Sequence, residues 1–177
     1  MKVEYIDNFV RNSRIYPALV DELEWERRGN TPRMEYYSNK IGVPYSYGRG
    51  RGIREYLPKP WHPYMLEIEQ NLASYIGSRF EVCFLNRYED QTDHLGWHAD
   101  DSPEMDDNRP IAIISFGVPR EIWFRPNGSS DIEKVLLRDS SLCIMPAGMQ
   151  DTHQHRIPKS GSTCGRRISL TFRGYVA

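Results

Sequence analysis

The sequence has few cysteines, no long apolar run and no marked excess of charge, and each absence excludes a class of protein. Its three cysteines are too few and too scattered for a disulfide framework or a Cys-x-x-Cys metal knuckle. No apolar stretch approaches the roughly 20 residues that span a bilayer, and the first residues lack the apolar core of a signal peptide. We therefore expect a soluble protein of a reducing compartment, the cytoplasm or, in a eukaryotic cell, the nucleus, with no membrane association.

Charge and length narrow the possibilities further. Lys and Arg number 23 against 24 Asp and Glu, a net charge of -1, which argues against a protein that coats nucleic acid by charge alone. Hydrophobic residues make up 39% of the chain, enough for a packed core. The 177 residues, without repeats or low-complexity segments, favour one domain spanning 1–177.

The sequence predicts two helices followed by a series of strands. Pro17–Trp25 and Pro60–Ile76 have apolar residues at helical spacing, and Gly77 is a stop signal. Beyond Gly77 the period changes to two, which places alternate residues on one strand face: Phe80, Val82, Phe84, Asn86 and Tyr88. Seven further strands are expected, at Leu95–Asp100, Ile111–Gly117, Glu121–Arg125, Ile132–Arg138, Leu142–Met145, His153–Ile157 and Arg166–Arg173. This order indicates an α+β fold that is mainly β, an antiparallel double-sheet barrel with the helices packed outside it.

Basic and aromatic residues alternate between Arg27 and Lys59. Eight basic side chains occur there: Arg27, Arg28, Arg33, Lys40, Arg49, Arg51, Arg54 and Lys59. They are interleaved with tyrosines and accompanied by only two acidic residues, Glu35 and Glu55. This composition suits a polyanion with stackable bases. The alternative is a solvated arginine-rich loop with the tyrosines packed beneath it.

A histidine and an aspartate two residues apart form a candidate metal site. On a strand, His98 and Asp100 leave the same face, so both can reach one ion. A second imidazole would complete a facial triad, and both His153 and His155 lie in a later strand. Such a triad leaves open positions that suit non-haem Fe(II), whereas zinc more often takes a closed or hydrolytic tetrahedral site. A surface histidine beside a turn carboxylate would have the same pattern.

The last predicted strand has a polar face that could bind an anion. Period two places Ile168, Leu170 and Phe172 on one face. The other face carries Arg167, Ser169, Thr171 and Arg173. Polar residues of such a strand ordinarily face water. Two arginines folded toward each other, with hydroxyls between them and further donors from Asn86 and Tyr88, would instead fit a dicarboxylate such as 2-oxoglutarate.

Four motifs in this order make the sequence similar to the AlkB family of Fe(II)/2-oxoglutarate-dependent dioxygenases. They are Asn86-Arg87-Tyr88, His98-Ala99-Asp100, His155-Arg156-Ile157-Pro158 and the strand from Arg167 to Arg173. Three shorter stretches resemble the DNA-repair branch: Pro58-Lys59-Pro60-Trp61, Pro110-Ile111-Ala112 and Ser115-Phe116-Gly117. The resemblance runs from about Pro32 to Arg173. It implies a helix and a double-stranded β-helix (jelly-roll) core over about 61–177, after an N-terminal extension and nucleotide-recognition lid over about 1–60.

The resemblance also assigns roles to residues. It implies Fe(II) held by His98, Asp100 and His155, because an apolar-Pro step follows the family's distal ligand. It implies 2-oxoglutarate bound by Asn86, Tyr88, Arg167, Ser169, Thr171 and Arg173. It places the substrate base against Tyr45, Ser46, Tyr47 and Asp101. The chain departs from the family pattern at Ser169, where Asn is usual, and at Ser102, where repair members carry another acidic residue.

The activity implied is oxidative demethylation of N-alkylated bases such as 1-methyladenine and 3-methylcytosine in DNA. In this reaction 2-oxoglutarate and O2 become succinate, CO2 and formaldehyde, and no obligate protein partner is implied. One alternative is an AlkB-type oxygenase acting on RNA, a protein or a small molecule. A nucleic-acid-binding module with a degenerate centre and a zinc hydrolase are further alternatives, although a hydrolase gives no reason for the pair Arg167 and Arg173.

Overall fold

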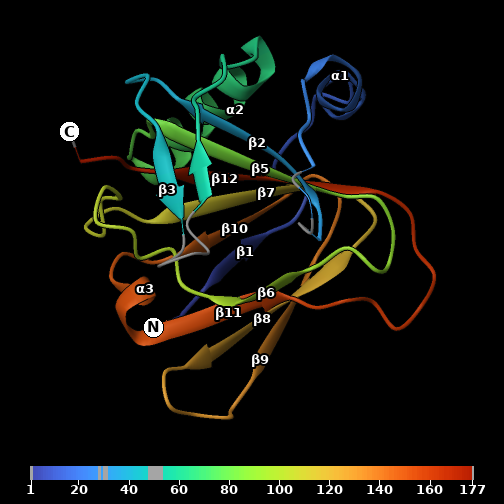
Figure 1. Cartoon of the computed structure of the whole chain (residues 1–177), viewed down its shortest axis with the longest axis vertical. Helices are drawn as coiled ribbons and strands as arrows, with labels where there is room; N and C mark the ends of the chain where they lie inside the picture. The colour runs from blue at the N-terminus through green and yellow to red at the C-terminus, as the bar shows by residue number, and fades with distance from the viewer. Residues whose placement is uncertain (1, 28, 30–31, 48–53, 177) are drawn as a thin grey trace.

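Three antiparallel sheets and three helices form the described part of the chain (Figure 1). The structure is a computed structural model that describes residues 2–27, 29, 32–47 and 54–176. The strands are β1 Glu4–Ile6, β2 Met34–Asn39, β3 Tyr45–Tyr47, β4 Arg54–Tyr56, β5 Val82–Tyr88, β6 Leu95–His98, β7 Ile111–Gly117, β8 Arg120–Pro126, β9 Glu133–Leu137, β10 Ser141–Met145, β11 His153–Ile157 and β12 Arg167–Arg173. The helices are α1 Ile15–Glu22, α2 Pro63–Ile76 and α3 Met149–Thr152.

A large and a small sheet face each other. The large sheet has six strands in the order β1-β10-β7-β12-β5-β2, and the small one has four in the order β6-β11-β8-β9. Apolar side chains of both sheets meet between them, among them Tyr88, Ile113, Ile122 and Phe124. The predicted mainly β architecture of two antiparallel layers is therefore confirmed, with β3 and β4 forming a separate hairpin at one end (Figure 1).

Helices α1 and α2 cover the other face of the large sheet. Leu19 of α1 and Leu72 of α2 are buried in one cluster with Ile168, Leu170 and Phe172 of β12. Because side chains alternate along a strand, the polar residues of β12 must point to the opposite face, between the two sheets. Among the described residues, no helix has the length and apolar character needed to cross a membrane.

The helix termini differ from the prediction by a few residues. α2 begins at Pro63, not Pro60, because His62 is its N-cap: the His62 Nδ1 accepts the Tyr64 N–H at 3.1 Å. It ends as predicted, where Gly77 takes the left-handed conformation (φ 78°) and donates its N–H to the carbonyl of Ala73. α1 spans Ile15–Glu22, so Pro17 lies within the first turn, where a helix needs no N–H donor.

The strand predictions agree with the structure from β5 onward, but the first 60 residues were predicted poorly. Phe80 lies before β5 and packs in the cluster beneath the helices, so its placement on the strand face with Phe84 is wrong. Strands β1 to β4 and helix α3 were not predicted. Since β1 pairs with β10 and β2 with β5, the large sheet extends across the expected division at about residue 60.

Candidate active site

The two imidazoles of the site form a directly opposed pair on neighbouring strands. β6 and β11 run antiparallel, and His98 is opposite His155 in their register. Residues directly opposite each other leave the same face of a sheet, and these two ring centroids are 4.2 Å apart. Strand pairing thus joins two histidines that lie far apart in the chain.

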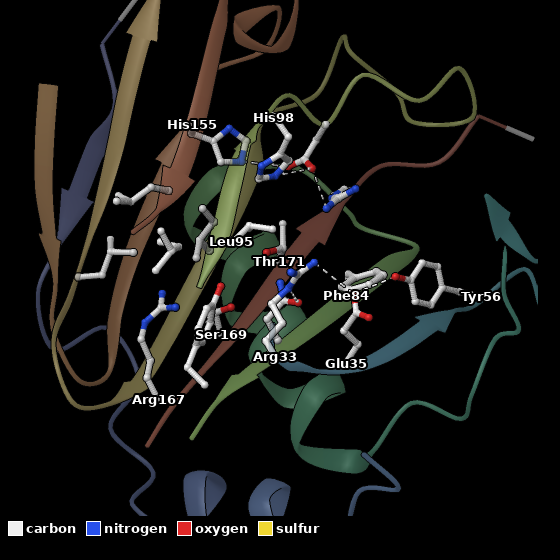
Figure 2. Close-up of a pocket in the computed structure, with 18 of the residues that line it drawn as sticks. Arg33, Glu35, Tyr56, Phe84, Leu95, His98, His155, Arg167, Ser169 and Thr171 are labelled. Carbon is white, nitrogen blue, oxygen red and sulfur yellow. Dashed lines mark hydrogen bonds and ion pairs between the residues drawn. The ribbon is translucent and has the colours of Figure 1, made fainter. Parts of the chain in front are cut away.

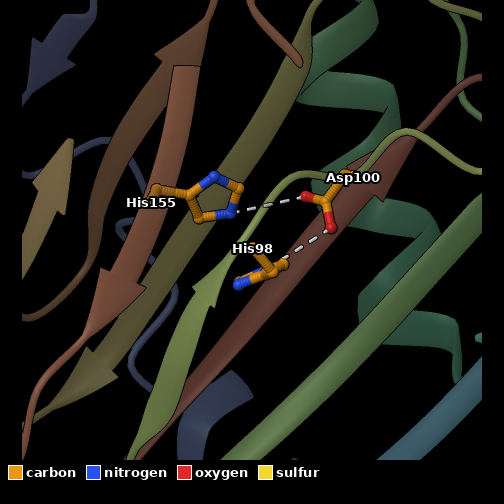
Figure 3. A group of neighbouring side chains, drawn as sticks. All are labelled: His98, Asp100 and His155. Carbon is orange, nitrogen blue, oxygen red and sulfur yellow. Dashed lines mark ion pairs between the residues drawn. The ribbon is translucent and has the colours of Figure 1, made fainter. Parts of the chain in front are cut away.

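Asp100 completes the group just beyond the end of β6. Its Oδ1 lies 3.6 Å from His98 Nε2, and its Oδ2 lies 3.6 Å from His155 Nε2 (Figure 3). The backbone N–H of Asp100 donates to Oε1 of Gln150 at 2.9 Å, which fixes the backbone of Asp100 to α3. The three residues can each offer one ligand atom within 4.8 Å of the others, and they form the one such His, Cys, Asp or Glu group among the described residues.

Both histidines are prepared to bind a cation as neutral imidazoles. Burial lowers the pKa of His98 below its ordinary value and lowers the pKa of His155 to about 3. The Nδ1 of His98 lies 2.8 Å from the carbonyl oxygen of Gly96. Because a carbonyl can only accept, the proton lies on Nδ1 and the Nε2 lone pair faces Asp100. No proton has to leave before a metal binds.

The carboxylate of the group is ionised. Burial alone would raise the pKa of Asp100, but the guanidinium of Arg173, whose Nη2 is 3.0 Å from Oδ1, holds that pKa below its ordinary value. Two neutral imidazoles and one carboxylate are the donor set typical of non-haem Fe(II). The residues therefore fit this ion.

The remaining histidines lie outside this group. His153 begins β11 opposite Pro126, and its Nδ1 is 2.7 Å from the Thr152 hydroxyl. His62 caps α2, and the ring of His94 contacts the carbonyl of Thr92. Of the two alternatives left by the sequence, the geometry brings His155 rather than His153 to His98 and Asp100.

A cavity extends from the histidines to the polar face of β12 (Figure 2). It has about 620 Å³ of empty space, counting the part that opens to solvent. Its lining includes all the residues expected to bind 2-oxoglutarate: Asn86, Tyr88, Arg167, Ser169, Thr171 and Arg173. The alternative in which the polar face of this strand meets water is wrong, because β12 pairs on both sides and is buried throughout.

Arg167 has hydrogen-bonding capacity left for a ligand. Its side chain is buried, and its Nη2 donates to the Ser115 hydroxyl at 2.8 Å. Its Nε and Nη1 find no hydrogen-bond partner among the described residues. A buried charge with unsatisfied N–H groups is unfavourable until a ligand completes it, and a carboxylate matches the planar fork. This end of the cavity therefore fits a carboxylate of 2-oxoglutarate.

Arg173 lies at the metal end of the same strand face, paired with Asp100. Arg167 contacts Ser115 and lies over the Tyr88 ring at 5.2 Å. The two guanidinium groups thus have separate partners and do not fold toward each other over one short anion, as their alternation on the strand had suggested.

The residues expected to contact the substrate base are distributed differently. Tyr45 is buried in the cavity wall, with its hydroxyl 2.9 Å from that of Ser102. Ser46 is exposed and lies outside the lining, and Tyr47 ends β3 opposite Arg54. Asp101 is exposed and borders a separate hollow beside Gln150, so its contact with a base stays a prediction.

The basic segment is less open than its composition indicates. Arg28, Arg49 and Arg51 lie outside the described residues. The side chains of others have protein partners: Arg27 with Asp93, Arg33 with Glu35, Lys40 with Glu69, and Lys59 with the carbonyl of Glu24. Four of its five tyrosines, Tyr36, Tyr37, Tyr45 and Tyr56, are buried, as the packing alternative expected.

Three residues with polar or charged groups line the cavity but were not identified from the sequence as part of the site: Arg33, Glu35 and Tyr56. Arg33 donates its Nε to Asn86 at 2.8 Å, and Tyr56 donates its hydroxyl to Glu35 at 2.9 Å. Their one signal in the sequence was their position in the basic and aromatic segment, which was interpreted as an outer surface. Pairing of β2 with β5 turns this segment inward.

Comparisons with known proteins agree with this geometry. The model of the 2OG-Fe(II) oxygenase superfamily matches residues 18–173. DNA oxidative demethylase ALKBH2 of Homo sapiens is 30% identical over 152 residues, 81% of this chain and 57% of that protein. Alpha-ketoglutarate-dependent dioxygenase alkB homolog 3 of Bos taurus is 29% identical over 177 residues, 90% of this chain and 60% of that protein. The chain spans less than two thirds of the length of these relatives.

A solved structure, titled "The structure of OsALKBH1", has the same fold. It superposes with a TM-score of 0.71 at 15% identity, and the alignment covers 98% of this chain and 96% of the other. The jelly-roll prediction is thereby confirmed. Family membership implies Fe(II), 2-oxoglutarate and O2 as cofactor and cosubstrates. The chain belongs to the 2OG-Fe(II) oxygenase superfamily, and the relatives it matches confirm the resemblance to the AlkB family.

Proposed function

We propose that this protein removes methyl groups from the ring nitrogens of alkylated DNA bases, with 1-methyladenine and 3-methylcytosine as substrates. The proposal rests on one observation. A single cavity contains the group His98, Asp100 and His155 and also Arg167, whose guanidinium has N–H groups without partners among the described residues. A metal site alone would suit many reactions, and an anion site alone would suit a binding protein. Together they fit a metal-dependent oxidation that consumes a keto-diacid.

The positions of the side chains in the cavity suggest which residues would bind Fe(II) and which would bind 2-oxoglutarate. His98, Asp100 and His155 would hold Fe(II), and Arg167 would bind one carboxylate of 2-oxoglutarate, with Asn86, Tyr88, Ser169, Thr171 and Arg173 lining the same space. When bound, the iron with 2-oxoglutarate and O2 supplies the oxidation: one oxygen atom enters the methyl C–H bond, and the other ends in succinate as CO2 leaves. The hydroxymethyl group then leaves the ring nitrogen as formaldehyde, and the base is restored.

The residues of the chain orient and shield this chemistry. Arg173 balances the charge of Asp100 in the buried site. The methyl groups concerned lie on the base-pairing edge, so the base must leave the helical stack or be unpaired to enter the cavity. Tyr45, Tyr56 and Phe84 line one part of the cavity and give a flat base aromatic surfaces to pack against.

The relatives support a nucleic-acid substrate, because the ALKBH2 proteins matched are named DNA oxidative demethylases. Together with the cavity, these names favour DNA over a protein or small-molecule substrate. The activity would operate where DNA is found, in the cytoplasm or, in a eukaryotic cell, the nucleus. The proposal needs no obligate protein partner.

Mass spectrometry of methylated oligonucleotides tests the proposal. Purified protein with Fe(II), ascorbate and 2-oxoglutarate is incubated with DNA and RNA strands, single and paired, that carry one methylated base each. We expect loss of the methyl group from 1-methyladenine and 3-methylcytosine in DNA, with one succinate formed per methyl lost. His98→Ala should abolish both products.

Three other outcomes would replace the proposal. Demethylation of RNA strands alone would assign an RNA substrate. Succinate formation that no oligonucleotide stimulates would leave an oxygenase of a protein or small molecule, and absence of Fe(II) or Mn(II) binding would indicate a nucleic-acid-binding module.

A further inference from the structure

Glu35 is a buried carboxylate on the wall of the catalytic cavity. It lies in β2, opposite Asn86 of β5, and its backbone also pairs with Glu26 on the other side at 2.7 and 3.0 Å. Its side chain is 2% exposed and lines the cavity that contains His98 and Asp100. In Figure 2, Glu35 and Tyr56 lie on one side of Arg33, and Arg167 lies on the other. Glu35 is therefore at the end of the cavity away from the predicted cosubstrate arginine.

The hydrogen bonds of Glu35 all converge on one of its two oxygens. The Tyr56 hydroxyl donates to Oε2 at 2.9 Å, and Arg33 Nη2 donates to the same oxygen at 3.3 Å. The other oxygen, Oε1, is shielded from solvent and has no partner among the described residues. Buried acceptors are rarely left unsatisfied in native proteins, so among the described residues this atom is an acceptor that a ligand in the cavity can satisfy.

The walls around this carboxylate are aromatic. Tyr45, Tyr56 and Phe84 line the same part of the cavity, with ring centroids 5.1 Å apart for Tyr56 and Phe84 and 6.2 Å apart for Tyr45 and Tyr56. Aromatic faces attract flat, positively charged groups, and a carboxylate adds an acceptor for an N–H on such a group. This combination selects a flat cation that carries an N–H donor.

The other carboxylates near the site are committed elsewhere or face away. Asp100 is paired with Arg173 and belongs to the proposed metal site. Asp101, the carboxylate expected to meet the base, is exposed and borders another hollow. Glu35 is ion-paired with Arg33 through Oε2 alone, so among the described residues that line the cavity it is the carboxylate whose second oxygen has no partner.

We infer that Glu35 selects the substrate base: its Oε1 accepts an N–H from the exocyclic amino group of a positively charged, N-methylated cytosine or adenine. The inference rests on the proposed function. Cytosine and adenine carry an amino donor on the relevant edge, whereas thymine carries a carbonyl acceptor there. A carboxylate at this position attracts the cationic 3-methylcytosine and repels the neutral 3-methylthymine, whose O4 would face Oε1.

Glu35→Gln should weaken this preference for a geometric reason. Tyr56 and Arg33 both donate to the Oε2 position, so the amide oxygen of the glutamine must occupy it. The amide nitrogen then takes the place of Oε1, and an acceptor becomes a donor of nearly the same size. The donor suits the O4 of 3-methylthymine and opposes the amino group of 3-methylcytosine.

The test compares 3-methylcytosine and 3-methylthymine in the same single-stranded oligonucleotide. We measure kcat/KM for both and the Kd of the Mn(II)-loaded protein for each strand by fluorescence anisotropy. Glu35→Gln should lower the ratio of kcat/KM for 3-methylcytosine over 3-methylthymine by about 10- to 100-fold, the discrimination of a good base contact. Glu35→Asp keeps the charge and should keep the preference for 3-methylcytosine. Glu121→Gln, an exposed glutamate on β8, is the matched control.

The outcomes separate this inference from the proposed function. If the wild-type protein demethylates neither strand, the proposed function fails. If it demethylates 3-methylcytosine and Glu35→Gln leaves the ratio unchanged, the inference is overturned. The inference also fails if Glu35→Asp loses the preference as completely as Glu35→Gln, or if Asp101→Asn lowers the ratio and Glu35→Gln does not.

Discussion

On its outer face, β12 packs Ile168, Leu170 and Phe172 against the helices, and on its inner face it presents Arg167 and Arg173 to the cavity. Both faces are buried to a similar degree. Burial of apolar surface stabilises the fold by about 25 cal/mol per Å², whereas burial of a guanidinium costs free energy unless it is fully paired. Stability and ligand binding are thus assigned to opposite faces of one strand, and substitutions on the two faces should separate them.

The largest effect on turnover is expected when a metal ligand in the cavity is removed. His155→Ala removes one of the two imidazoles, so turnover should fall by more than the roughly 100-fold typical of losing an outer hydrogen-bond partner. Mn(II) titration by calorimetry should show the loss of binding directly, and circular dichroism should show a folded protein. His153→Ala, on the same strand but outside the group, is the control. Equal losses in both variants would contradict the assignment.

The outer face should affect stability and leave the ligand site intact. Leu170→Ala leaves a hole beneath the helices, and we expect the free energy of unfolding to fall by about 2–5 kcal/mol, as for other buried Leu→Ala changes. Urea denaturation measures this loss. The Kd for 2-oxoglutarate, measured well below the melting temperature, should stay within a factor of two or three (about 0.6 kcal/mol). A large rise in that Kd would show that the two faces are not independent.

Arg167→Met should have the opposite effect: weaker binding of 2-oxoglutarate with no loss of stability. Losing the charged hydrogen bonds to a carboxylate should weaken 2-oxoglutarate binding by about 10- to 100-fold, measured by calorimetry on the Mn(II)-loaded protein. The free energy of unfolding should not decrease, since the methionine replaces a buried, incompletely paired charge with a shorter, uncharged chain. Destabilisation without weaker binding would reverse the roles of the two faces.

The smallest effect concerns pH and the metal-free protein. Burial lowers the pKa of His155 to about 3, against about 6.5 in the unfolded chain. Between these values only the unfolded state holds the proton, so the stabilisation present above pH 6.5 is lost as the pH falls toward 3, by up to about 1.4 kcal/mol per pH unit. Urea denaturation with chelator from pH 7 to 5 measures the slope. A His155→Gln variant should show a shallower slope, and an identical one would contradict the prediction.

The sequence was most informative where strands alternate in a simple way. Ile168 and Arg167 fall on opposite faces by period two alone, and the interval from His98 to Asp100 implied one shared face. The sequence alone did not choose between His153 and His155, because the choice depends on the β6–β11 register. The resemblance chose His155, which the register places opposite His98.

The N-terminal part of the site was not predictable for a physical reason. β2 is buried on both faces, so Glu35 and Tyr36 show no alternation of polar and apolar residues. The sequence of this segment instead has the composition of a polar, tyrosine-rich loop. Only pairing with β5, far along the sequence, reveals that Arg33 and Glu35 face the cavity and that Tyr36 faces the helices.

The pairing of His98 with His155 has a mechanical consequence. β6 is the edge strand of the small sheet and joins it through β11 alone. An ion coordinated by both imidazoles would fix the register of these two strands, since a shift of one residue would turn one histidine to the opposite face of the sheet. Metal binding would then stabilise this edge strand against local opening, and slower amide hydrogen exchange along β6 would measure that stabilisation.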